Sequence, residues 1–143
     1  KGLGILSARY LKFGAYAGPI VRRLVGSMTS MADGKALAFS LWNLQDRGVI
    51  YILPNTEVYE GMVVGNTSKG EEMMVNPTKG KQLSNMRSSG ADEAITLVPA
   101  WEITIERGLE IMNADEYLEV TPKSVRLRKQ LLTDSDRAKA SRK

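Results

Sequence analysis

The pattern that most restricts the fold of this chain is a series of short apolar runs separated by turn-forming residues. Pro54-Asn55, Asn76-Pro77 and Pro122-Lys123 divide segments that are rich in β-branched, aromatic and other apolar residues. Such runs are typical of short β-strands. We therefore expect strands at residues 27–32, 49–53, 57–64, 72–75, 94–98, 117–121 and 124–127.

Only two segments have the spacing of an amphipathic helix. Residues 35–47 place Leu37, Leu41 and Leu44 on one face. A second helix is expected to open at Thr104, with Ile105, Leu109 and Met112 on its buried face. Helices and strands do not alternate as parallel βαβ units require, so we predict an α+β fold with a mostly antiparallel, partly barrel-like sheet and two short helices.

The last two expected strands predict a hairpin around Pro122-Lys123. In the second strand Val125 and Leu127 would face inward, while Ser124, Arg126 and Arg128 would line the outer face. A row of cations on one sheet face suits a phosphate backbone. The alternative is an edge strand that is protected from aggregation by its charge.

The residue types exclude several kinds of chemistry. The chain has no Cys and no His, so disulfides, common zinc sites and imidazole catalysis cannot be built. It has no GxxxxGK[ST] phosphate loop. The acidic pairs at 71–72, 92–93 and 115–116 are interpreted as solvated loop charges, because adjacent strand residues point to opposite faces. We expect no catalytic residue, metal or cofactor in this chain.

Positive charge is concentrated at the C-terminal end. Residues 1–120 carry 12 basic and 14 acidic side chains, whereas residues 121–143 carry eight basic and two acidic ones. Such an end favours a polyanionic partner, with a solvated tail as the alternative.

Residues 78–91 form a second unusual segment, with three cations and no acid. Its small polar side chains could bond sugars or bases, and its two glycines permit close approach to RNA. The alternative is a disordered surface loop. Together with the hairpin, this segment gives the predicted RNA-binding residues: Lys79, Lys81, Gln82, Ser84, Asn85, Arg87, Ser88, Ser89, Lys123, Arg126, Arg128 and Lys129.

The first residues alternate like a strand from Gly4 to Tyr16, and Gly18-Pro19 ends the pattern. Together with a first residue that is Lys1 rather than Met, this predicts a start inside a longer protein. We expect three parts: residues 1–17 as the last strand of a preceding domain, 18–132 as an RNA-contacting domain, and 133–143 as a basic, disordered tail. The sequence shows neither a signal peptide nor an apolar stretch of about 18 residues, so we expect a cytoplasmic protein without membrane contact.

Four ordered blocks carry a resemblance to a known family. They read GSMTSMADGKALAFSLWNLQDRG (26–48), VYEGMVVG (58–65), LSNMRSSGADEA (83–94) and EVTPKSVRLRK (119–129). The chain resembles the C-terminal region of the BipA/TypA family of translational GTPases. It departs from the family pattern at Asn55, where glycine is usual, and at Ser84, where threonine is common.

The resemblance implies a protein related to elongation factor G, with its GTP- and Mg²⁺-binding domain upstream of this chain. Residues 4–16 would be the final strand of a domain that resembles domain V of elongation factor G. The family's C-terminal domain extends toward the peptidyl-transferase centre, where a flexible loop meets the acceptor end of A-site tRNA. That loop corresponds to residues 79–92. Family members assist ribosome assembly and translation under stress.

We therefore interpret the chain as an RNA-contact module that is a monomer and not an enzyme by itself. Its expected partners are large-subunit rRNA and A-site tRNA. One alternative is a module that docks a ribosomal or regulatory protein, which would need an exposed apolar patch. Another is a small enzyme that uses Asp, Glu and Lys, which would need carboxylates converging in a pocket.

Overall fold

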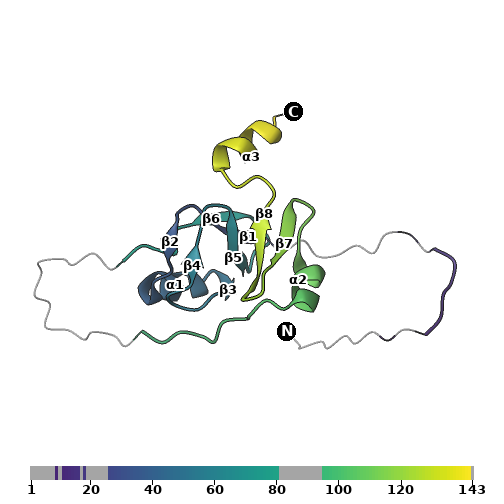
Figure 1. Cartoon of the computed structure of the whole chain (residues 1–143), viewed down its shortest axis with the longest axis horizontal. Helices are drawn as coiled ribbons and strands as arrows, with labels where there is room; N and C mark the ends of the chain where they lie inside the picture. The colour runs from purple at the N-terminus through teal and green to yellow at the C-terminus, as the bar shows by residue number, and fades with distance from the viewer. Residues whose placement is uncertain (1–8, 10, 17, 19–25, 81–94, 143) are drawn as a thin grey trace, which may run out of the picture.

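The computed structural model describes residues 9, 11–16, 18, 26–80 and 95–142. Within them the elements run β1 (Ser27–Ser30), β2 (Gly34–Lys35), α1 (Ala38–Gln45), β3 (Gly48–Ile50), β4 (Glu57–Val58), β5 (Met62–Thr67), β6 (Met73–Val75), α2 (Ile105–Ile111), β7 (Glu116–Val120), β8 (Val125–Lys129) and α3 (Asp134–Ala140) (Figure 1).

The main sheet has the order β6-β1-β5-β8-β7, and β3 also pairs with β5. The β1–β6 pair is parallel and the other pairs are antiparallel, while β2 and β4 form a separate two-stranded sheet. The predicted α+β class and mostly antiparallel sheet are confirmed. The partly barrel-like closure is wrong, and three helices are present in the described residues where two were predicted.

The strand β5 separates two apolar cores because its side chains alternate between the sheet faces. Met62 and Val64 belong to a core that includes Leu41 of α1. Val63 belongs to a second core with Leu127 of β8, against which residues around α2 pack. Each face of the sheet is thus closed by a different helix, and the β7–β8 hairpin lies at the end of the sheet that α2 covers.

Helix α2 begins as predicted, but of its three predicted buried residues only Met112 packs against the second core. The Thr104 hydroxyl accepts a hydrogen bond from the Arg107 N–H at 3.3 Å, which caps the helix. Ile105 and Leu109, predicted to be buried, are 46% and 57% exposed. Gly108 faces the sheet instead and packs directly on Leu118. A glycine allows this close approach, so the smallest residue rather than the leucine faces β7.

The strand predicted at 94–98 is wrong for its described part, since residues 95–98 belong to no strand. A side chain replaces a strand partner there. The Gln45 amide donates to the Thr96 carbonyl at 3.1 Å and accepts from the Val98 N–H at 3.0 Å. The helix α1 thereby holds this segment without a sheet.

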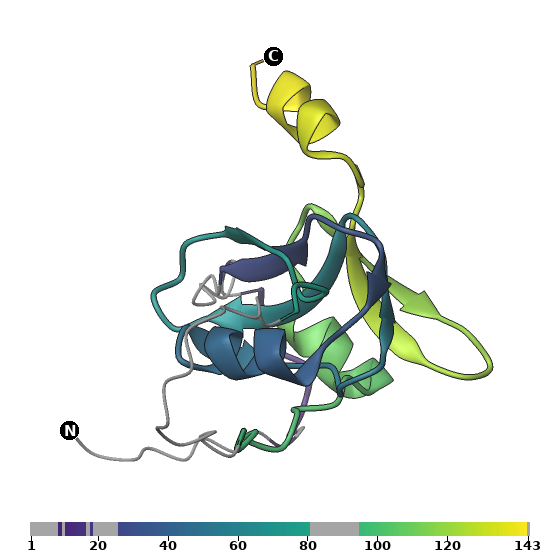
Figure 2. The same ribbon diagram turned by 90° about the vertical axis from the view of Figure 1, so that its left-hand side faces the viewer.

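The two ends of the chain differ from expectation. Of the strand predicted at 4–16, residues 9 and 11–16 are described and carry no strand, and the link to a domain of elongation factor G is not confirmed. Where a disordered tail was predicted, the helix α3 projects from one end of the sheet (Figures 1 and 2), and the Arg137 Nη2 of α3 lies 3.2 Å from the Met74 Sδ of β6. The Thr133 hydroxyl caps α3 by accepting a hydrogen bond from the Asp136 N–H. Acidic residues in the first turn stabilise the helix through their interaction with the positive end of its dipole. Among the described residues, no helix has the length and apolar character needed to cross a bilayer.

Asn55 has φ +66°, the one left-handed conformation among the described non-glycine residues. Asparagine tolerates this region better than most residues. The turn therefore accepts Asn55 where the family usually has glycine.

A glycine inside an expected strand, such as Gly61 within residues 57–64, indicates a bulge or a close backbone approach, and the structure confirms the close approach. Its φ is +86°, and a Cβ there would lie 2.7 Å from the Leu132 Cα and 2.8 Å from the Leu132 carbonyl oxygen. The Gly61 carbonyl also accepts from the Lys129 N–H at 2.8 Å. This residue therefore joins β5, β8 and the start of the C-terminal segment.

The substitution Gly61→Ala is expected to lower the free energy of unfolding by roughly 1–3 kcal/mol, because it adds both a backbone clash and an unfavourable φ. Gly14→Ala is the control, since no atom lies within 4 Å of a Cβ at that position. Urea unfolding of both variants measures the effect. Equal stability of the two variants would show that the approach at Gly61 can relax.

Candidate nucleic-acid interface

The β7–β8 hairpin positions most of the described basic residues that were predicted to bind RNA. Its register pairs Tyr117 with Arg128, Leu118 with Leu127 and Glu119 with Arg126. Directly paired residues share a sheet face. One face therefore carries Leu118 and Leu127, which pack in the second core. The opposite face carries Tyr117, Glu119, Arg126 and Arg128.

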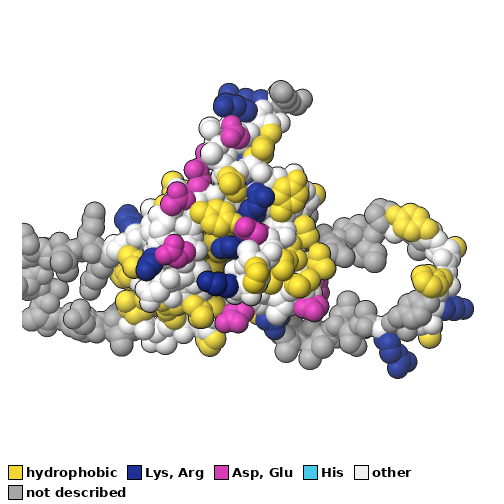
Figure 3. Space-filling view, viewed as in Figure 1, with side chains coloured by type: hydrophobic (Ala, Val, Ile, Leu, Met, Phe, Trp, Pro, Cys, Tyr) yellow, Lys and Arg dark blue, Asp and Glu magenta, His cyan; other side chains and the backbone are white. Residues whose placement is uncertain are grey.

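That opposite face combines guanidinium groups with aromatic rings. The Arg128 Cζ lies 5.2 Å from the centroid of the Tyr117 ring, and the Arg126 Cζ lies 5.7 Å from that of Tyr59. Glu119 joins the second pair, because its Oε2 accepts from the Tyr59 hydroxyl at 2.6 Å and lies 3.0 Å from the Arg126 Nε. We call these five residues (Tyr59, Tyr117, Glu119, Arg126 and Arg128) the outer hairpin face. Figure 3 shows dark blue cations among apolar side chains over this part of the sheet.

Apart from Lys129, the remaining predicted residues divide into three groups. Lys123 is exposed at the hairpin turn, beside the outer hairpin face. Lys79 is exposed beyond β6, and β6 lies at the opposite edge of the main sheet from β7. The others lie outside the described residues: Lys81, Gln82, Ser84, Asn85, Arg87, Ser88 and Ser89. The structure therefore brings together Lys123, Arg126 and Arg128.

Lys129 was predicted to contact phosphate, which requires an accessible ammonium group. This prediction is wrong, because the ammonium group is buried. Lys129 pairs with Glu116 on the inner face of the hairpin and is only 1% exposed. Its Nζ bonds Glu72, lies 2.7 Å from the Asp115 Oδ2 and lies 3.1 Å from the Glu116 Oε1. These three carboxylates lie within 4.8 Å of one another with the ammonium among them.

Glu116 also corrects the interpretation of the acidic pairs as solvated loop charges, since it is only 2% exposed. Its carboxylate accepts from the Ser27 hydroxyl and from the Asn113 N–H, the latter at 3.0 Å. Burial opposes the charge of Lys129, but its hydrogen bonds to Asp115 and Glu72 and the charge of Glu116 outweigh this, so the pKa of Lys129 is raised. The cluster is therefore an ion-pair network that joins β8, β7, β1 and the segment before β6.

Lys129→Met is expected to destabilise the fold by roughly 3–5 kcal/mol, because it leaves the buried Glu116 carboxylate without its cation. The double variant Lys129→Met/Glu116→Gln is expected to recover part of that loss. Urea unfolding of the two single variants and the double variant measures the coupling. Additive effects would mean that the two side chains do not interact.

Tyr59 gives the outer hairpin face a pH dependence. Burial, with the hydrogen bond to Glu119, raises the pKa of Tyr59 to about 12. The folded state thus favours the neutral phenol. The stability gained from this is complete below about pH 10 and is lost as the pH rises toward 12.

The stability difference between the parent chain and Tyr59→Phe is therefore expected to shrink as the pH rises from about 10 to 12. Urea unfolding at several alkaline pH values measures this difference. Glu119→Gln, which removes one cause of the shift, should move the change to lower pH. If the stability difference between the two proteins stayed constant over this pH range, the raised pKa of Tyr59 would be contradicted.

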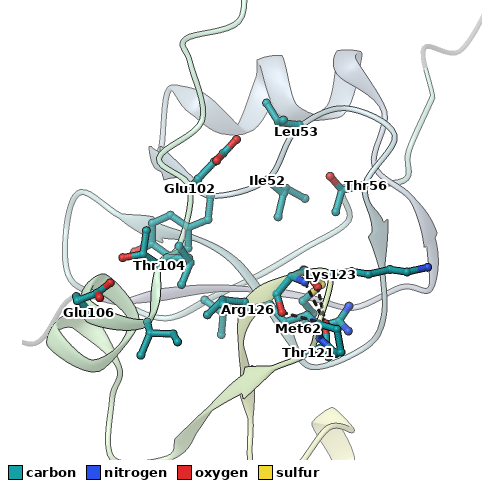
Figure 4. A pocket seen from close by; sticks show the side chains of 17 residues that line it. Ile52, Leu53, Thr56, Met62, Glu102, Thr104, Glu106, Thr121, Lys123 and Arg126 are labelled. Atoms are coloured by element: carbon teal, nitrogen blue, oxygen red, sulfur yellow. Dashed lines mark hydrogen bonds between the residues drawn. The ribbon is translucent and has the colours of Figure 1, made fainter.

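A hollow of about 760 Å³ lies beside the hairpin turn (Figure 4). Ile52, Met62 and Val63 form part of its apolar lining, and Lys123 and Arg126 contribute cations. Further polar side chains come from the segment before α2 and from the turn: Glu102, Thr104, Thr121 and Ser124. The hollow therefore adjoins the outer hairpin face through Arg126.

Comparison with known proteins identifies the family. The family model for the TypA/BipA C-terminal domain matches residues 25–134. The chain belongs to the TypA/BipA family. The match spans every strand of the described residues and the helices α1 and α2, so the two cores and the whole β7–β8 hairpin are part of the family domain.

Three relatives, each named "Large ribosomal subunit assembly factor BipA", illustrate the TypA/BipA similarity. The Escherichia coli K12 protein is 44% identical over 99% of this chain, the Bacillus subtilis protein 42% over 100%, and the Haemophilus influenzae protein 43% over 99%. The chain spans 23–24% of the length of these relatives. The recognised resemblance is thereby confirmed.

Sequence reasoning missed Tyr59, Tyr117 and Glu119 as part of this surface. For Tyr117 and Glu119 a signal was present, because a hairpin centred on Pro122-Lys123 places them opposite Arg128 and Arg126. Tyr59 comes from the turn before β5, 60 residues from Glu119 in the sequence, and no local pattern brings it here.

Proposed function

We propose that this chain is the RNA-contacting C-terminal domain of a ribosome-associated TypA/BipA protein. The observation that carries the proposal is the hairpin surface, where Lys123 is exposed at the turn and Arg126 and Arg128 lie on the outer face beside Glu119. Arginine and lysine on one sheet face match the spaced negative charges of a phosphate backbone. The relatives' name, a large ribosomal subunit assembly factor, supports rRNA of that subunit as the polyanion.

The finer mechanism follows the family resemblance. Residues 79–92 would contact the acceptor end of A-site tRNA, with Lys79 at the described edge of that segment. The whole protein would be a GTPase, with GTP and Mg²⁺ bound by a domain outside this chain. Its nucleotide state would control the RNA contact through the arrangement of domains, during ribosome assembly and translation under stress.

Lys129 is not part of the proposed contact, because its ammonium is buried among three carboxylates. Its role is to hold the hairpin on the sheet. Phosphate contacts are assigned to Lys123 and Arg128 at the hairpin and to Lys79, with Arg126 partly neutralised by Glu119.

A protein-docking function is the second candidate, and α2 supplies the observation that favours it. Ile105 and Leu109 are 46% and 57% exposed on a helix next to the hairpin. Exposed apolar side chains on a helix suit a partner protein. The enzyme alternative has less support, since the acidic cluster in the described residues encloses a lysine ammonium.

The test measures binding of the 143-residue chain to large ribosomal subunits and to tRNA over a range of salt concentrations. The variant Lys123→Ala/Arg128→Ala removes two proposed phosphate contacts. Its affinity should fall, and the slope of log K against log salt should decrease by roughly 1.4–1.8. The control Lys35→Ala/Lys139→Ala removes equal charge from exposed ion pairs elsewhere and should leave the slope unchanged.

A third variant, Lys79→Ala/Lys81→Ala/Arg87→Ala, tests the loop separately. Loss of tRNA binding in this variant alone would assign the tRNA contact to residues 79–92. Binding that is insensitive to salt in the parent chain would contradict an RNA-contact function and favour docking through Ile105 and Leu109.

A further inference from the structure

The outer hairpin face carries ordered pairs of guanidinium groups and aromatic rings, which a phosphate contact alone does not require. Lysines on flexible side chains would be enough to neutralise phosphates, because a phosphate contact is mainly a matter of charge. This face instead pairs each planar guanidinium with an aromatic ring, at 5.2 Å for Arg128 with Tyr117 and at 5.7 Å for Arg126 with Tyr59. Planar groups of this kind are suited to stacking on bases.

We infer that the outer hairpin face is a stacking platform for unpaired bases of single-stranded RNA, centred on Tyr117 and Arg128. This inference rests on the proposed RNA-contact function and adds the form of RNA that the surface takes. Tyr117 is 49% exposed although it sits in a regular strand. Its cross-strand partner Arg128 supplies charge for the adjoining phosphate.

The platform is held in place before RNA arrives. The backbone register fixes Tyr117 opposite Arg128, and an Arg128 Nη1–H donates to the Lys129 carbonyl at 3.2 Å. Glu119 holds Tyr59 and Arg126 together through contacts of 2.6 and 3.0 Å. Groups that are already ordered lose little conformational entropy on binding.

The inner side of the hairpin explains why the platform stays exposed. Leu118, Leu127 and the Lys129–Glu116 pair fill that side and anchor the hairpin to the sheet. The helix α2 packs against the same side, through Gly108 on Leu118. The planar groups thus project from a rigid support, and the hollow beside Arg126 continues the surface toward the turn.

Single-stranded RNA fits this face better than an acidic protein segment does. An acidic peptide would engage the two guanidinium groups through carboxylates and would gain little from the Tyr117 ring. Duplex RNA exposes phosphates and 2′-hydroxyls but keeps its bases stacked away from a protein ring. Only an unpaired base uses both the ring and the cation.

The experiment titrates the 143-residue chain with oligoadenylate and oligouridylate of about ten nucleotides, and with a duplex RNA of equal length. The parent chain is expected to bind single strands more tightly than the duplex, and oligoadenylate more tightly than oligouridylate, because adenine stacks more strongly. Tyr117→Leu should weaken oligoadenylate binding by about 10-fold. Tyr117→Phe, which keeps the ring, should restore it.

Two controls separate the ring from other effects. Tyr16→Leu removes an exposed tyrosine, 85% exposed, far from the hairpin in sequence and should not change the affinity. Arg128→Lys keeps the charge but removes the planar group, and it should reduce the preference for adenine. Thermal unfolding of each variant verifies that the fold is intact.

The outcomes distinguish this inference from the function on which it rests. Salt-dependent RNA binding that is the same in Tyr117→Leu, or equal for duplex and single strand, would overturn the platform and leave the RNA contact standing. Absence of RNA binding in the parent chain would overturn both. Displacement of the RNA by polyglutamate with equal loss of affinity in Tyr117→Leu and Tyr117→Phe would assign the face to an acidic protein partner.

Discussion

The ammonium group of Lys129, buried among three carboxylates, is the interaction on which the rest of the structure depends. It joins Glu116 of β7, Asp115 of the turn before it and Glu72 of the segment before β6. Glu116 in turn bonds Ser27 of β1. The network therefore links three parts of the chain that are distant in sequence: the hairpin, the segment before β6 and β1. Such a network is costly to desolvate, and it is stable only when every member keeps its partner.

This network also determines what the hairpin can offer to a partner. Antiparallel pairing puts Lys129 and Glu116 on the same face as Leu127 and Leu118, so these four side chains anchor the hairpin. Arg126 and Arg128 then project from the other face together with Tyr117 and Glu119. Successive side chains of a strand point to opposite faces of the sheet, and this alternation both anchors the hairpin and exposes its cations.

In the two helices that cover the sheet, packing decides which side chains make the contacts, and the sequence pattern alone does not. In α2, leucine and isoleucine lie at the spacing of a buried face, yet Gly108 makes the closest contact with β7. In α1, the Gln45 side chain replaces a strand partner for residues 96–98. Both outcomes depend on how near two elements approach, which hydrophobic periodicity does not encode.

The sequence by itself determined the family, the α+β class, the hairpin at Pro122-Lys123, the Thr104 helix start and the special backbone at Gly61. The family follows from the four matching sequence blocks, and the structural features follow from local signals, namely turn residues, capping residues, glycine positions and side-chain alternation, that act over a few positions. The tertiary structure alone decided that Lys129 is buried while Arg126 and Arg128 are not, and that Tyr59 joins Glu119. The physical reason is that the burial of a charge depends on partners that distant segments bring to it, and the carboxylate of Glu72 lies 57 residues from Lys129 along the chain.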